Sequence, residues 1–408
     1  MPVMLMWSAL IASSLLAGAG AVALLASRRR VEPLAVLVSL ATATASIYLV
    51  VAAWERYQRW DVLGYAIAIV ATGLAGGWAL AVVTLERLAK TPECPPATRN
   101  AEPQGHTAVI IMACSEPTEY SPSETALLLQ AIADSEMMEP SLLTLPLLFF
   151  AQKSRYQAIG GTSPAESQLR LIAERLSREL APETYGPVLW AACSGSARLA
   201  VRVSELIACG YHKIVVVGAA AGENLAFAEA KREVDTMRID PGSAQLSYAR
   251  NLTDSVALTN MLARRIHAVP ETEGVTGVVL IGYGQSENHS RMNPGFDESE
   301  TSFLNRLRAR LIDGGIDSQH IRIAWTDWVS PDITSAVRHL AALGCQRMLI
   351  VPAVHCVDTL GTLLDLDIAI KQARIENTVS MVLLPTWHDD ETLIEELKLR
   401  ILELGQVD

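Results

Sequence analysis

The sequence of 408 residues is poor in charge, since only 19% of its residues are Asp, Glu, Lys or Arg. A soluble globular chain normally carries about 25% charged residues. Positive charge is especially scarce, with 33 Lys and Arg against 44 Asp and Glu, which argues against a nucleic-acid-binding protein with a basic face. Half of the residues are hydrophobic, which excludes a disordered chain and raises the question of where the apolar surplus lies.

The apolar surplus lies mainly near the N-terminus, in three runs that lack charged residues altogether. They cover residues 5–26, 34–54 and 62–85. Each has about 20 residues or more, enough for a helix to cross a hydrocarbon layer. We therefore expect residues 1–90 to form a membrane anchor of three transmembrane helices. A signal peptide fits the first run poorly, because the Arg residues at 28–30 follow the run instead of preceding it.

The basic residues predict how the anchor is oriented. The Arg residues at 28–30, together with Arg87 and Lys90, lie on one side of a three-span topology, and this side is expected to be cytoplasmic. The N-terminus would then face outward, most simply at a bacterial inner membrane. No Asp, Glu, Lys, Arg or His lies within a span, which favours an anchor in membrane lipid over a transporter. Gly73 and Gly77 share a helix face and favour close packing, within the chain, in a homo-oligomer or in a larger membrane protein complex.

The remainder of the chain has the pattern of an α/β protein. A linker is expected at residues 91–104, which contain four prolines. Beyond it, short apolar runs typical of buried parallel strands cover residues 108–112, 213–217, 277–281 and 347–351. Amphipathic stretches typical of helices cover residues 164–180, 197–208, 300–312 and 332–343. This alternation predicts parallel sheets with helices on both faces.

Two stretches of this α/β part look alike and indicate an internal repeat. In each, a predicted helix ends at a glycine, Gly210 or Gly344, and a basic residue opens the next strand, Lys213 or Arg347. Glycine is the usual residue at a left-handed helix stop. The pattern predicts two similar Rossmann-like halves, at residues 105–250 and 251–408. Ligands of such folds bind at the carboxyl ends of the strands, so the residues there are the first candidates for function.

Several familiar motifs are missing from these strand ends. There is no Gly-rich phosphate loop, no nucleophile elbow and no Cys-x-x-Cys pair. The six cysteines are most simply reduced thiols in a cytoplasmic domain. Cys114 follows the first predicted strand, Tyr283 follows the third, and both His355 and Asp358 follow the fourth.

Four segments, in order along residues 105–375, carry a family resemblance. One segment is residues 110–117, and another combines residues 328–331 with residues 342–352. Residues 155–164, Arg-Tyr-Gln-Ala-Ile-Gly-Gly-Thr-Ser-Pro, and residues 358–367, Asp-Thr-Leu-Gly-Thr-Leu-Leu-Asp-Leu-Asp, are the others. Together they resemble the ferrochelatase family, the class II tetrapyrrole metallochelatases.

The resemblance implies a porphyrin cleft between the two halves, with a catalytic His after the third strand and a Glu after the fourth. Metal insertion needs such groups, because two pyrrole protons must leave as a divalent ion such as iron enters. The sequence departs from this pattern at both positions. The His position is Tyr283 and the Glu position is Gly361. An unperturbed tyrosine has a pKa of about 10 and is a poor base at neutral pH.

The resemblance and the strand-end positions together define the candidate site residues. The catalytic candidates are Tyr283, His355 and Asp358, and the metal candidates are His355, Asp358 and Asp365. The candidate contacts to a tetrapyrrole, porphyrin or haem, are Cys114, Tyr283, His355, Leu147 and Phe149, the last two from an apolar lip. Structural alternatives remain open: His355 and Cys114 packing in the interior, and Asp358 capping a helix.

Three functions follow from these observations. The first is a membrane-anchored, ferrochelatase-like protein that binds a tetrapyrrole in the cleft and has lost or altered metal insertion. The second is an active metallochelatase that inserts iron into a porphyrin, with His355 and the acidic row from Asp358 to Asp365 replacing the usual groups. The third is a scaffold subunit of a larger membrane complex without catalysis.

Overall fold

The computed structural model describes residues 3–28, 31–88, 106–134, 141, 143–193, 195–221, 225–237, 244–270, 273–285, 295–326, 329–375 and 379–405. The predicted linker and the basic residues Arg29, Arg30 and Lys90 lie outside these ranges. The chain divides into two compact units. The anchor unit comprises Met1–Pro92 and Glu119–Thr162, and the sheet unit comprises Glu93–Thr118 and Ser163–Asp408.

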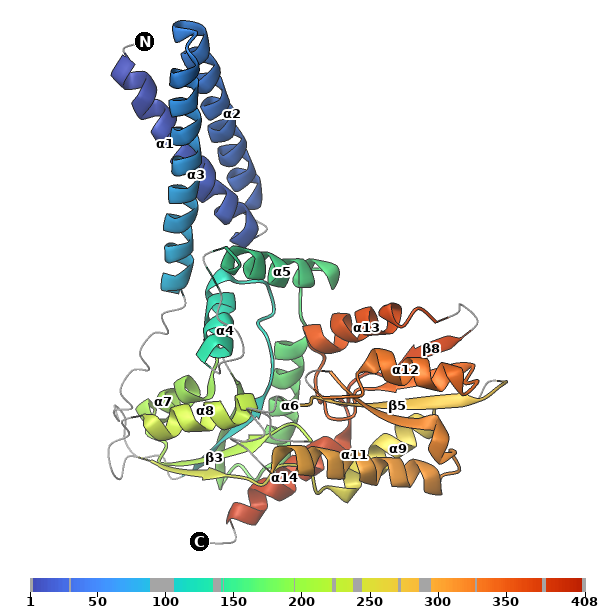
Figure 1. The fold of residues 1–408 in the computed structure, drawn as a ribbon. Helices are drawn as coiled ribbons and strands as arrows, with labels where there is room; N and C mark the ends of the chain where they lie inside the picture. Colours follow the sequence, from blue (N-terminus) through green and yellow to red (C-terminus); the bar gives the residue numbers. More distant parts are fainter. Residues whose placement is uncertain are drawn as a thin grey trace. The chain divides into compact units, whose positions relative to one another are not determined.

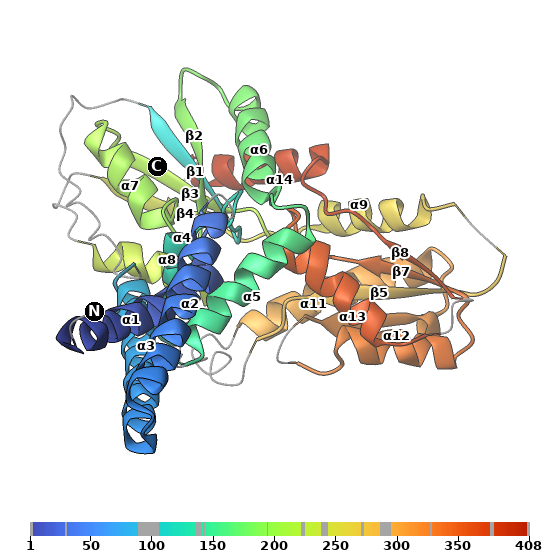
Figure 2. The ribbon, with the colours of Figure 1, turned by 90° about the horizontal axis from the view of Figure 1, so that it is seen from above.

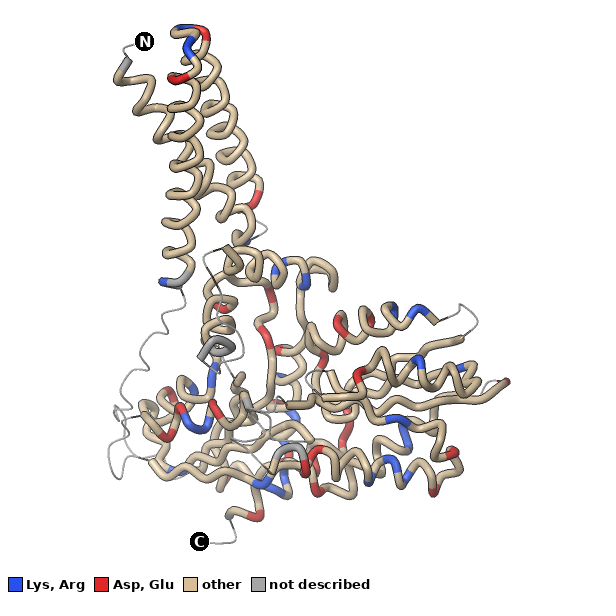
Figure 3. The backbone as a smooth tube through the Cα atoms, in the orientation of Figure 1, with Lys and Arg blue, Asp and Glu red and all other residues tan. Residues whose placement is uncertain are grey.

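The anchor unit contains the three expected apolar helices, α1 (Val3–Ala26), α2 (Glu32–Tyr57) and α3 (Trp60–Leu88). All three are long and apolar enough to cross a membrane. Charged residues lie only toward the ends of these helices (Figure 3). The prediction of three helices is confirmed, and their length and composition indicate an integral membrane protein. Its orientation stays a prediction.

Close packing between α1 and α3 depends on glycine. A Cβ added at Gly77 would collide with the backbone carbonyl of Leu15, and one added at Gly18 would collide with the carbonyl of Leu74. Gly73 meets the side chain of Ser14 in the same way. The predicted small-residue contact is therefore made within this chain.

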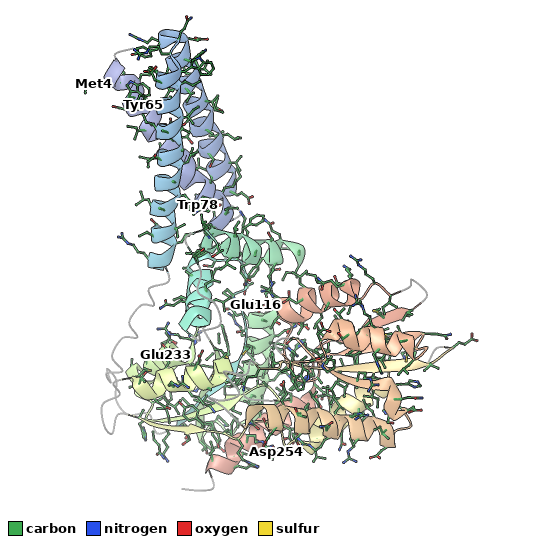
Figure 4. All side chains as sticks on the ribbon, in the orientation of Figure 1. Met4, Tyr65, Trp78, Glu116, Glu233 and Asp254 are labelled. Atoms are coloured by element: carbon green, nitrogen blue, oxygen red, sulfur yellow. The ribbon has the colours of Figure 1, made fainter. Side chains whose placement is uncertain are left out.

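Two further helices of the anchor unit, α4 (Pro122–Asp134) and α5 (Leu145–Ala158), come from a segment inserted between β1 and α6. In Figure 1, α5 lies crosswise at the base of the three long helices. Phe149 of α5 is fully buried among Val22 of α1, Val82 of α3 and Leu129 of α4. Trp78 of α3, labelled in Figure 4, packs against the same cluster. The insertion thus belongs to the core of the anchor unit.

Polar contacts fix the insertion to the end of α1. The Tyr120 hydroxyl donates to the carbonyl of Ala26 at 2.8 Å, and the Lys153 ammonium donates to that of Leu24 at 3.1 Å. Carbonyls in the last turn of a helix have no partner within the helix, so these side chains cap it. Lys153 is buried and also pairs with Glu32 of α2 at 3.1 Å.

The sheet unit contains two four-stranded parallel sheets of the same topology. The first sheet has the spatial order β2 (Tyr185–Ala192), β1 (Thr107–Ala113), β3 (Lys213–Gly218) and β4 (Gln245–Tyr248). The second has the order β6 (Ile321–Trp325), β5 (Thr276–Gly282), β7 (Arg347–Val351) and β8 (Ser380–Leu383). The predicted class, two similar α/β halves with parallel sheets, is confirmed.

Helices follow the strands, as the alternating pattern predicts. The α-helices are α6 (Ala165–Glu179), α7 (Leu199–Ala208), α8 (Leu225–Thr236), α9 (Val256–His267), α11 (Phe296–Asp313), α12 (Ile333–Ala342), α13 (Leu366–Gln372) and α14 (Glu391–Gly405). A short 3-10 helix, η1 (Ser318–His320), precedes β6, and a π-helical turn, η2 (Gly361–Asp365), precedes α13. Gly210 and Gly344 have φ angles of 92° and 84°, which confirms the two predicted helix stops.

The strands place alternate residues in different cores. Val109 and Ile111 of β1 face a core that both sheets share, together with residues of α6, α9, α11 and α14. Ala108 and Ile110 face the opposite side, where α7 and α8 cover the first sheet. Figure 2 shows α12 and α13 on one side of the second sheet and α9 on the other. The shared core joins the two halves into one unit.

Candidate functional site

The carboxyl ends of four strands bring together residues that carry chemistry. Cys114 follows β1, Cys193 follows β2 and Tyr283 follows β5, while His355 and Cys356 lie in the loop after β7. The sequence predicted the gathering of Cys114, Tyr283 and His355 at this edge. The thiol of Cys193 is an addition that the structure reveals.

Tyr283 and His355 stack on each other at this edge. Their ring centroids are 4.1 Å apart and their planes are tilted by 44°. His355 is only 4% exposed, and its Nδ1 atom has no hydrogen-bond partner within the described chain. Burial lowers the pKa of His355 to about 4, because the charged imidazolium loses its hydration. His355 is therefore a neutral imidazole at physiological pH.

Glu300 of α11 holds the backbone around Tyr283. Its carboxylate is fully buried and accepts from the backbone N–H groups of Tyr283 at 2.9 Å and Gly284 at 3.3 Å. The Thr326 hydroxyl donates to the carbonyl of Tyr283 at 2.8 Å. Burial, with smaller contributions from neighbouring thiols, raises the pKa of Tyr283 well above its ordinary value. The phenol is consequently protonated across the physiological range.

Sequence reasoning missed Glu300, although a signal was present. The buried apolar residues of α11 include Phe303, Leu304 and Leu307, and Glu300 precedes them at helical spacing. A carboxylate on the buried face of an amphipathic helix requires hydrogen-bond partners. That requirement identifies Glu300 as a residue that shapes the site.

Three thiols, those of Cys114, Cys193 and Cys356, lie near Tyr283. The Sγ atoms of Cys114 and Cys193 are 3.2 Å apart. The Cys356 thiol donates to the carbonyl of Ala219, in the segment directly after β3. Burial raises the pKa of both the Cys193 and Cys356 thiols, so these sulfurs are protonated as well.

Asp358 is occupied by hydrogen bonds. Its two carboxylate oxygens accept from the Gln168 amide at 2.8 Å and from the Thr386 hydroxyl at 2.9 Å. Its backbone N–H donates to the Gln168 side-chain oxygen at 2.7 Å. The following turn is capped by Thr359, whose hydroxyl accepts from the N–H of Thr362. Asp358 therefore connects three segments of the sheet unit and does not cap this turn.

The predicted metal ligands are not gathered at one point. Asp365 is exposed, and no three His, Cys, Asp or Glu side chains of the described residues are placed to hold one ion. Gly361, at the position where the resemblance implies a Glu, has Thr359 and Asp365 as its nearest neighbours. The metal-binding roles of His355, Asp358 and Asp365 remain predictions.

Glu116, labelled in Figure 4, ties the segment after β1 to the loop after β7. Its carboxylate accepts from the Ser163 hydroxyl and from the backbone N–H of Leu360, the latter at 2.8 Å. This carboxylate thus stabilises the start of the turn that contains Gly361.

Leu147 and Phe149 both belong to the anchor unit. Phe149 is fully buried in the core of that unit, whereas Leu147 is exposed. The contact of both residues with a tetrapyrrole stays a prediction. The exposed side chain of Leu147 is accessible for such a contact, whereas that of Phe149 is already surrounded by apolar neighbours.

The model of the ferrochelatase family matches residues 106–403, well over half of the chain. A solved structure of SirB from Bacillus subtilis with Fe3+ is similar at a TM-score of 0.47 and 12% identity, covering 74% of this chain and 99% of that one. A multi-domain protein of Deinococcus radiodurans, DR2241, described as structurally similar to chelatases, gives a TM-score of 0.43 at 14% identity. That match covers 73% of this chain and 55% of the other. A search of curated proteins found no match.

Proposed function

The chain belongs to the ferrochelatase family, and on that premise we propose that it binds a tetrapyrrole at the membrane while its metal-insertion chemistry is lost or altered. The ligand would occupy the carboxyl ends of the strands, at Cys114, Tyr283 and His355. The three apolar helices would hold this family domain at the bilayer.

The observation that carries the proposal is the neutrality of the strand-end groups. His355 has a pKa of about 4, and the pKa values of Tyr283, Cys193 and Cys356 are all raised. Metal insertion requires a base that takes two pyrrole protons, and a useful base has a pKa near the working pH. None of these four groups meets that condition, which favours binding over metal insertion.

The same groups suit a flat, apolar ligand. The half-buried ring of Tyr283, stacked on His355, offers aromatic surface of the kind that lines ligand sites. The Nδ1 atom of His355 is a neutral imidazole nitrogen without a partner in the described chain, which is the form that ligates haem iron. His355 would hold a haem through this atom, and the haem would supply an open coordination position on its iron.

Metal insertion into a porphyrin is the second candidate function, and the His355 nitrogen also favours it. A neutral imidazole is the usual ligand for a divalent transition metal ion, so His355 would receive the incoming metal. The two functions differ in their products, because only the second converts a metal-free porphyrin into a metalloporphyrin.

The test uses the full chain in lipid nanodiscs. Titration with a metal-free porphyrin, followed by porphyrin fluorescence, measures binding, and addition of Zn²⁺ or Fe²⁺ then measures metal insertion. We expect saturable binding and no insertion above the protein-free rate. His355→Ala should weaken haem binding by about tenfold, equivalent to roughly 1.4 kcal/mol. His320→Ala, at the opposite end of β6, is the matched control and should bind as the unaltered protein does.

Two results would redirect the proposal. Insertion that depends on His355 and proceeds at many turnovers would establish the metallochelatase instead. Failure to bind either porphyrin or haem would remove both candidates and leave only the prediction of a scaffold within a membrane complex.

A further inference from the structure

Cys114 and Cys193 lie side by side because their strands are in register. β1 and β2 are parallel neighbours in which Met112 pairs with Ala191 and Ala113 with Ala192. The next residue on each strand is a cysteine, and both side chains point to the same place, since their sulfurs are 3.2 Å apart.

The backbone spacing suits a covalent bond between these sulfurs. Neighbouring strands lie about 4.8 Å apart, within the Cα separations of roughly 4.4 to 6.8 Å that disulfides span. A disulfide bond is about 2.05 Å long, so the sulfurs need to approach by about 1 Å from their present contact. A small side-chain rotation achieves this without moving the sheet.

The other cysteines provide internal comparisons. Cys209 is exposed at the end of α7, and Cys345 is buried beside α12 behind the second sheet. Cys356 lies nearer the pair, but its thiol already donates to the carbonyl of Ala219. Exposure alone would favour oxidation of Cys209, whereas the short distance between the two sulfurs favours oxidation of Cys114 and Cys193.

We propose that Cys114 and Cys193 form a redox-active dithiol that closes to a disulfide at the floor of the strand-end site. Two S–H bonds of the protein and the S–S bond of the oxidant break, one S–S bond forms in the protein, and the two protons end on the two thiols that leave. The two electrons pass to a low-molecular-weight disulfide, which is cleaved to two thiols. One sulfur first attacks this oxidant to give a mixed disulfide, and the neighbouring sulfur then displaces the small thiol.

Burial slows the formation of this disulfide but does not change which cysteines it joins. The pKa of Cys193 is raised by burial, so little thiolate is present at neutral pH. Since the thiolate is the attacking species, the rate of closure should rise by about tenfold per pH unit below the thiol pKa. Tyr283 shares the surroundings of both sulfurs, so closure alters the environment of the site directly.

The test treats the full chain in detergent micelles with oxidised glutathione at pH 7, 8 and 9. Digestion without reduction, followed by mass spectrometry, identifies linked peptides. We expect a peptide pair joined through Cys114 and Cys193, loss of two of the six thiols, and their recovery after treatment with dithiothreitol. Cys209→Ser should give the same linked pair, whereas Cys193→Ser should give none.

The unaltered protein alone decides the outcome, so a variant that fails to fold leaves the test intact. A link between Cys114 and Cys356, or glutathione adducts on Cys114 and Cys193 without a link between them, would overturn the proposal. Since the readout is a covalent bond, it is independent of whether the chain binds a tetrapyrrole.

Discussion

Burial changes the chemistry of the side chains that meet at the strand ends. From the sequence, the titratable side chains of His355 and Tyr283 are candidates for acid–base catalysis. Burial in the interior, however, keeps both side chains in their neutral forms. The carboxylates nearby, Glu300 and Glu116, are occupied by backbone and hydroxyl donors. At the scale of single residues, these neutral and hydrogen-bonded groups support the proposal of ligand binding over proton transfer.

Protonation of His355 should destabilise the folded protein in acid. Its pKa of about 4 lies below the ordinary value of 6.5, so the unfolded chain takes up the proton first as the pH falls. The stability associated with the neutral imidazole is complete above pH 6.5 and is lost as the pH falls toward 4, by about 3 kcal/mol. His355→Phe, which keeps an aromatic ring beside Tyr283, should lose less stability over this range.

Unfolding midpoints of the two proteins in detergent at pH 7 and pH 4.5 measure this difference. His320→Phe controls for the loss of a histidine elsewhere in the sheet unit. If the midpoints of the unaltered and His355→Phe proteins fall equally with pH, the imidazole is not buried as described.

Asp358 should behave as a structural residue. Its oxygens accept two side-chain hydrogen bonds, and leaving a buried donor such as the Thr386 hydroxyl without its acceptor typically costs about 1 to 3 kcal/mol. Asp358→Ala should lower the unfolding midpoint accordingly and leave porphyrin affinity unchanged. Asp365→Ala, at an exposed position, should change stability by less than about 0.5 kcal/mol. A stable Asp358→Ala protein that no longer binds a divalent metal would instead support the predicted metal role.

The sequence located part of this site and missed the rest for physical reasons. Cys114, Tyr283 and His355 were identifiable because each follows an apolar strand, and parallel strands end at a common edge. Cys193 follows β2, a strand that was not among those predicted from the sequence. The hydrogen bonds of Asp358 join residues 190 and 28 positions apart in the chain, a pairing that no local pattern reveals.

At the scale of elements, burial decided which strands were predictable. β1, β3, β5 and β7 are the inner strands of their sheets, and their apolar runs were found in the sequence. The outer strands β2, β4, β6 and β8 contain more half-buried positions, and β4 and β8 have only four residues each. Such strands bury fewer of their residues than the inner strands and were missed.

Gly77 should be essential for the packing of α3 against α1. Gly77→Leu would place its side chain against the carbonyl of Leu15 and force the helices apart, at a cost of about 1 to 3 kcal/mol or more. Gly64→Leu on the same helix is the matched control, because nothing lies within 4 Å of the added Cβ. Thermal unfolding in detergent should show a lower midpoint for Gly77→Leu alone. Equal midpoints for the two variants would contradict the close α1–α3 contact.

At the scale of the whole molecule, the family domain and the membrane anchor share one stretch of chain. The family match covers residues 106–403, yet residues 119–162 within it pack as part of the anchor unit. The segment that the resemblance assigned to an apolar lip is thus held by Tyr120 and Lys153 at the end of α1. Local periodicity predicts neither contact, since both form across more than 90 residues of chain.

The central claim is that this anchored family member holds a tetrapyrrole. The most direct measurement is the absorbance spectrum of the full chain purified from membranes of cells that make tetrapyrroles, before and after addition of haem. We expect a Soret band that copurifies with the protein or appears on haem addition, and that shifts in His355→Ala. A protein that shows no Soret band in either condition would contradict it.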